Sequence, residues 1–163
     1  APEQVESLHA AGGFDLTLVK ADGARMRGIK APKPGEPVVP RSAAKVLVVV
    51  SAAVLGQPLD QRIAHRPERV AEIAGLAIGQ PIGPEHMARM FSAEHGLLQG
   101  TEFFDVCAVI NQVDDERLQR EAEAAAFAML EASPALDRVV LTCLGPGRDP
   151  DRSPVGIIRR AGA

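Results

Sequence analysis

Three apolar runs limit the folds open to this chain more than any other feature. They are KVLVVV at residues 45–50, DVCAVI at 105–110 and RVVLTCL at 138–144. Runs of β-branched residues without polar alternation are typical of strands covered on both faces. Apolar residues recur with helical spacing over 114–131, which predicts a helix there. Strands that alternate with helices predict an α/β domain of three layers, with a mostly parallel sheet and helices on both faces.

The rest of the chain divides into shorter pieces around one long loop. Four prolines and three glycines fall between residues 20 and 41, and proline cannot donate to a strand ladder, so a loop is predicted there. We expect helices at 2–11, 65–79 and 84–91, and strands at 14–19 and 155–159. With 163 residues, 46% of them hydrophobic, the chain has the size of one α/β domain spanning 1–163 with its own core.

Composition excludes several classes of partner. The net charge is −3, and Trp and Tyr are absent, so neither a global basic field nor a base-stacking platform for nucleic acid is expected. No apolar stretch reaches the roughly 18–20 residues of a membrane span, so no membrane partner is expected. Cys107 and Cys143 lie inside apolar runs, which indicates reduced, buried thiols and a cytoplasmic location.

The first candidate site follows the predicted strand at 14–19. Asp22 and Gly23 come just after its apolar residues, the position at which a carboxylate reaches Mg²⁺ and a glycine admits a phosphate. The alternative interpretation is a simple Asp-Gly turn. Asp22 is therefore the candidate magnesium ligand, and Asp22 and Gly23 are candidate nucleotide-binding residues.

The loop at 20–41 is cationic although the whole chain is acidic. Its candidate anion-binding residues are Arg25, Arg27 and Lys30, because guanidinium and ammonium groups at fixed positions suit a phosphate or carboxylate. The alternative is a solvated basic loop without a ligand.

The second candidate site follows the strand at 105–110. Asn111 and Asp114 have the spacing with which GTP-binding domains read guanine, the carboxylate accepting from the base. Asp114 is equally a candidate N-cap for the helix that follows. Gln112 stands where the usual guanine motif has Lys. No nucleophile elbow and no paired-histidine spacing occur, so no catalytic residue is assigned.

Five stretches of the chain carry a family resemblance: LVKADGARMRGIKAPKPGEPVVP, LGQPL, HRPERVAEIAGL, GQPIGPEHMARM and VINQVDD. Through these stretches, which lie within roughly residues 14–144, the chain resembles the YqeC-type accessory proteins of selenium-dependent hydroxylases. It implies a P-loop NTPase-like fold and a nucleotide-binding accessory role in the maturation of a selenium-dependent molybdenum hydroxylase. GTP or ATP with Mg²⁺ would be the ligands, and the hydroxylase or its cofactor-maturation proteins would be the partners.

The resemblance also has a gap. The family usually carries a GxxxxGKT loop, and this chain contains no Gly-Lys pair, so the first strand and the phosphate loop are missing. Either the chain is the C-terminal part of a longer nucleotide-binding domain, or the site has decayed. NTPase activity is expected only with an upstream P-loop. An unpaired strand edge predicts one of three outcomes: a marginally stable chain, a homodimer formed through that edge, or an N-terminal segment that accompanies the chain. The alternative function is a non-enzymatic interaction module whose basic loop, 20–41, binds an acidic partner or an anionic pterin cofactor.

Overall fold

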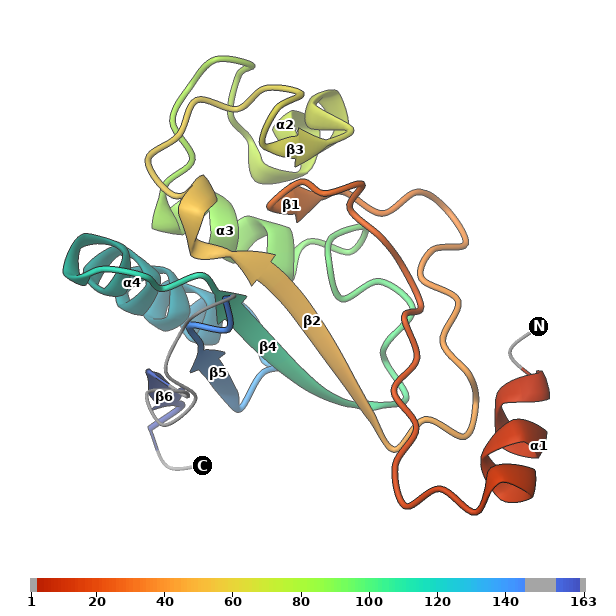
Figure 1. Ribbon diagram of the computed structural model, residues 1–163. Helices are drawn as coiled ribbons and strands as arrows, with labels where there is room; N and C mark the ends of the chain where they lie inside the picture. The colour runs from red at the N-terminus through yellow and green to blue at the C-terminus, as the bar shows by residue number, and fades with distance from the viewer. Residues whose placement is uncertain (1–2, 146–154, 162–163) are drawn as a thin grey trace.

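The computed structural model describes residues 3–145 and 155–161 (Figure 1). The helices are α1 Glu3–Gly12, the 3-10 turn η1 Ala52–Val54, α2 Pro67–Ala74, α3 Pro84–Ser92 and α4 Glu116–Ala132. The strands are β1 Ile29–Lys30, β2 Lys45–Ser51, β3 Ala64–His65, β4 Asp105–Asn111, β5 Arg138–Leu141 and β6 Gly156–Arg159. The protein is therefore of the α/β class, as the three apolar runs predict.

The main sheet has four strands in the order β2-β4-β5-β6. β2, β4 and β5 are parallel, and β6 is antiparallel to β5. β1 and β3 form a separate parallel pair of two residues each. The predicted mostly parallel sheet is confirmed for the three apolar runs, and the carboxyl ends of β2, β4 and β5 meet at one edge.

Helices α3 and α4 pack on a single face of the main sheet (Figure 1). The core joins their buried residues to the strand residues Val50, Ala108, Ile110, Val139 and Leu141. The strand order advances in one direction from β2 to β5, so right-handed crossovers put both connections on the same side. The prediction of three layers with helices on both faces is wrong for the described residues, because a second helical layer needs a reversal of this order.

The opposite face of the sheet is only partly covered. The register aligns Val49, Val109, Val140 and Ile157 across the four strands. Val49 is 58% exposed and Ile157 is 46% exposed. β2 is also an edge strand of this sheet. At its last residue, Ser51, the backbone N–H donates to the Gly28 carbonyl.

The strand predicted at 14–19 is not formed. The segment is extended and exposed, with Leu16 at 73% and Leu18 at 83% exposure. Its alternating apolar residues have strand propensity, but a strand exists only when a neighbouring strand pairs with its backbone. The predicted loop at 20–41 is confirmed except that it contains the short strand β1.

Two helices are shorter than their sequence patterns suggest. α2 begins at Pro67, after Arg66 in a left-handed conformation (φ 63°), and ends at Gly75 (φ 68°). α4 begins at Glu116 and is capped by Asp115, whose Oδ1 accepts from the Leu118 N–H at 2.7 Å.

Among the described residues, no helix combines the length and apolar composition that crossing a membrane requires.

Candidate functional site

A polar crevice lies over the carboxyl ends of β2 and β4. It has a volume of about 280 Å³ and is lined by Met26, Arg27, Gly28, Val49, Val50, Ser51, Asn111 and Gln112. This is the edge where open parallel sheets hold their ligands. The loop before β1 forms one wall, and the ends of β2 and β4 form the other.

The loop wall is fixed by backbone bonds at Gly28. Its N–H donates to the Ile63 carbonyl at 3.0 Å, and its carbonyl accepts from the Ser51 N–H at 2.9 Å. A Cβ on Gly28 would lie 2.4 Å from a Val54 methyl group, so only glycine permits this approach. The neighbouring Arg27 donates from Nε to the Gln61 carbonyl at 2.7 Å. The loop is therefore held against the end of β2.

Two residues on facing walls have left-handed backbones. Met26 and Gln112 both have φ of 64°, a conformation that costs energy in residues other than glycine. The Gln112 side chain is held by Ser51, whose Oγ accepts from the Ala53 N–H at 3.0 Å and donates to Gln112 Oε1. Strained residues that are held in place often lie at binding sites.

Asn111 joins the ends of β4 and β5. Its Oδ1 accepts from Thr142 Oγ1 at 2.9 Å and from the Leu144 N–H at 3.0 Å. Because both bonds use the oxygen, Asn111 has a bracing role and still lines the crevice with Ser51 and Gln112.

Asp114 lies close to Asn111 in the chain but does not line this crevice. It is exposed, and its Oδ1 is 3.1 Å from Cys143 Sγ. The alternative interpretation of Asp114 as the helix N-cap is wrong, because Asp115 occupies that position. Cys107 is buried, as the sequence predicts, whereas Cys143 is partly exposed, so the prediction of a buried thiol is wrong for Cys143.

Asp22 belongs to an ionic cluster that also contains the buried Lys30 and the partly exposed Glu36 and Arg66. Lys30 is only 8% exposed and pairs with Asp22 and, at 2.7 Å, with Glu36. Arg66 binds Glu36 through two nitrogens, at 2.8 and 3.2 Å. The hydrogen bonds from Arg66 and Lys30 hold the pKa of Glu36 far below its ordinary value. The cluster therefore pins the loop at 20–41 to the start of α2.

His65 lies beside the same cluster. Burial, together with the charges of Arg66, Arg25 and Lys30, lowers the pKa of His65. The lowered pKa favours the neutral form of the imidazole.

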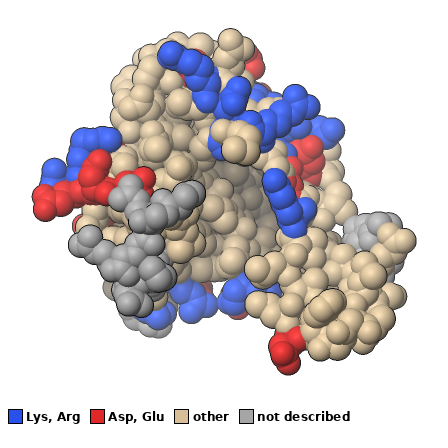
Figure 2. All heavy atoms as spheres, viewed as in Figure 1, with Lys and Arg blue, Asp and Glu red and all other residues tan. Residues whose placement is uncertain are grey.

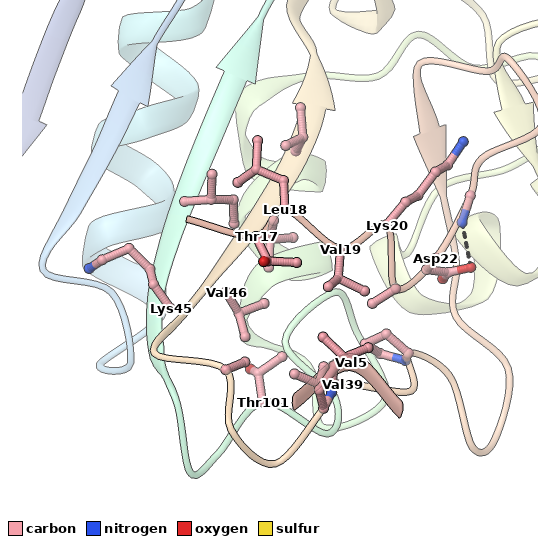
Figure 3. A pocket seen from close by; sticks show the side chains of 18 of the residues that line it. Val5, Thr17, Leu18, Val19, Lys20, Asp22, Val39, Lys45, Val46 and Thr101 are labelled. Atoms are coloured by element: carbon pink, nitrogen blue, oxygen red, sulfur yellow. Dashed lines mark hydrogen bonds between the residues drawn. The ribbon is translucent and has the colours of Figure 1, made fainter. Parts of the chain in front are cut away.

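A larger trough runs along the free edge of β2. Its volume is about 1120 Å³, and its lining is mostly apolar (Figure 3). Val46 to Val49 form one wall, and Thr17, Leu18 and Val19 lie opposite, with Lys20 and Asp22 at one end. Gly28 and Val49 line both cavities, so the trough and the crevice adjoin.

The structure divides the predicted site residues between the two cavities. Asp22, Gly23 and Lys30 line the trough, and Arg27 and Asn111 line the crevice. Arg25 and Asp114 line neither. Sequence reasoning did not place Ser51 or Gln112 in a site, although Ser51 directly follows a VVV run and so stands at a strand end.

Lys and Arg side chains gather around the upper part of a hollow in the molecular surface (Figure 2). Two members of the predicted anion-binding set are already engaged, since Lys30 pairs with carboxylates and Arg27 donates to backbone carbonyls. Arg25 is exposed and has no carboxylate partner among the described residues. Within 3–145 and 155–161, no group of three His, Cys, Asp or Glu side chains is placed to hold a metal ion.

The fold and these cavities define a class: an α/β protein with a mixed sheet and a polar crevice at the carboxyl edge of its parallel strands. Residues 1–68 match the family model described as YqeC protein. The curated relative named "Uncharacterized protein YqeC", from Escherichia coli (strain K12), is 35% identical over 75 residues. These two matches show that the N-terminal part of the chain, residues 1–68, is similar to YqeC proteins.

The likeness to the relative is partial. It covers 46% of this chain and 29% of the relative, so the chain matches less than a third of the relative's length. No solved structure matches the chain.

Proposed function

We propose that this chain is a YqeC-type nucleotide-binding accessory protein for the maturation of a selenium-dependent molybdenum hydroxylase. The maturation role is the one that the family resemblance in the sequence implies. The observation that supports nucleotide binding is the position of the crevice, over the carboxyl ends of β2 and β4 and adjoining the trough. A small polar crevice beside a larger apolar trough suits a ligand with an anionic end and a flat ring system.

Magnesium enters this proposal with the nucleotide rather than through a protein-held site. The Oδ1 of Asp22 already accepts from Lys30 and from the Gly23 N–H at 2.7 Å. No carboxylate is among the described residues that line the crevice. Mg²⁺ is commonly bound by one or two carboxylates plus substrate phosphates. Because the Asp22 carboxylate is already paired with Lys30, the structure does not favour the predicted role of Asp22 as a magnesium ligand.

Calorimetric titration of the chain with GTP and with ATP, each with Mg²⁺, tests nucleotide binding. We expect a dissociation constant in the micromolar to millimolar range, because this chain has no Gly-rich phosphate loop. The absence of saturable binding by both calorimetry and equilibrium dialysis would overturn the nucleotide proposal. Added protein should also increase the yield of active hydroxylase in a maturation assay, and an unchanged yield would refute the accessory role.

The second candidate is the interaction module. The gathering of Lys and Arg around the hollow favours it (Figure 2). Arg25 is the member of the predicted set that is exposed and unpaired with carboxylates among the described residues. Binding of a polyglutamate peptide should then weaken with salt and with Arg25→Glu, while Arg120→Glu on α4 serves as the charge-matched control. Equal effects of the two variants would rule out this interpretation.

A further inference from the structure

Three residues that line the crevice carry side-chain N–H groups with no acceptor in the part of the chain that the structure describes. Gln112 Oε1 accepts the hydrogen of Ser51 Oγ, because that hydroxyl already accepts from the Ala53 N–H. The amide nitrogen of Gln112 has no acceptor among the described residues. It is therefore the group of this side chain that can donate to a ligand. The tight holding of the oxygen fixes the orientation of the amide.

The side-chain amide of the neighbouring residue, Asn111, is held in the same way. Its oxygen accepts from Thr142 and Leu144, so its nitrogen is the remaining group, again with no acceptor in the described part of the chain. Arg27 adds a third donor from the loop wall. Its Nε and Nη1 donate to the carbonyls of Gln61 and Arg25, and its Nη2 has no acceptor within the described ranges.

These three donors come from separate points of one crevice, and one of them carries a full positive charge. The described lining contains no carboxylate. Donors that are fixed by their own hydrogen bonds need little reorganisation when an anion binds. Three donors suit a tetrahedral group with three terminal oxygens better than a planar carboxylate with two.

We propose that Arg27, Asn111 and Gln112 form a phosphoryl-binding site in this crevice. The inference rests on the proposed function for the identity of the whole ligand, a nucleotide, whose sugar and base would extend past Gly28 and Val49 into the trough. In this proposal Asn111 donates to phosphoryl oxygens. This role replaces the reading of a guanine base by Asn111 and Asp114 that the sequence spacing predicts. The strained backbone of Gln112 keeps its amide at the crevice.

The test is a titration of wild-type protein with pyrophosphate, GTP, guanosine and acetate, monitored through the side-chain amide NMR signals of Asn111 and Gln112. The key variant is Gln112→Glu, which keeps the shape and the acceptor oxygen but replaces the donor with a charged acceptor. Gln57→Glu is the matched control, since Gln57 is exposed and lines neither cavity. We expect pyrophosphate and GTP to shift both amide signals, and Gln112→Glu to weaken their binding at least about tenfold. The control should stay within about twofold.

The outcomes separate the two proposals. If GTP binds wild type and Gln112→Glu equally, the phosphoryl site is overturned and nucleotide binding stands. If pyrophosphate binds in a Gln112-dependent way but nucleotides bind no better, the nucleotide proposal fails and the phosphoryl site stands. Acetate binding as tight as pyrophosphate, or wild-type amide signals that do not move, overturns the site even if Gln112→Glu does not fold.

Discussion

Glu36→Gln removes the charge at the centre of the ionic cluster while keeping the size of the side chain. Glu36 accepts from Arg66 at 2.8 and 3.2 Å and from Lys30 at 2.7 Å. A hydrogen bond to a charged group contributes about 1.5 kcal/mol or more, so the two partners together contribute about 3 kcal/mol. The amide keeps one acceptor oxygen, which restores about 1 kcal/mol. We therefore expect the free energy of unfolding to fall by about 2 kcal/mol at pH 7.

The pH dependence provides the sharper check. The pKa of Glu36 is lowered by folding from its ordinary value of 4.5, so its stabilisation is complete above that value and decreases as the pH falls below it. At pH 3.5 the advantage of wild type over Glu36→Gln should shrink by about 1.4 kcal/mol. Urea unfolding at both pH values measures it, with Glu72→Gln, an exposed acid on α2, as control. An equal loss in the control, or a difference that is the same at both pH values, would refute the reasoning.

Three further perturbations test the fold around the site. Gly28→Ala places a Cβ 2.4 Å from Val54 and should lower the free energy of unfolding by about 1–3 kcal/mol. Gly23→Ala is the control, because its Cβ meets only the end of the Lys20 side chain and should lower that free energy much less. Thermal unfolding compares the two variants. Asp115→Ala removes the N-cap of α4 and should cost about 1 kcal/mol, while Asp115→Asn, which still caps, should stay near wild type in urea unfolding. We also propose that copies of the chain pair through the free edge of β2. Val49→Lys should then shift sedimentation velocity toward monomer without loss of stability, and an unchanged distribution would contradict pairing there.

The candidate site was only half accessible to sequence reasoning. The rule that ligands lie beyond the carboxyl ends of parallel strands led to Asn111, which does line the crevice. The same rule, applied to the predicted strand at 14–19, placed Asp22 at the same edge. Because that segment pairs with no strand, Asp22 instead lies in the trough with Lys30. Pairing between distant segments cannot be read from local pattern, so Asp22 and Asn111, which both follow a predicted strand in sequence, lie in different surroundings.

Local sequence pattern was enough to predict the elements that depend on residues close together in the chain. The apolar runs gave β2, β4 and β5, and the apolar stripe with its acidic first turn gave α4, because period and capping are encoded within a few residues of each other. The tertiary structure decided which face of the sheet is covered, that 14–19 stays outside the sheet, and that Ser51 and Gln112 meet across 61 residues. These features depend on strand order and on hydrogen bonds between segments far apart in the chain, and only the folded backbone brings those groups within bonding distance.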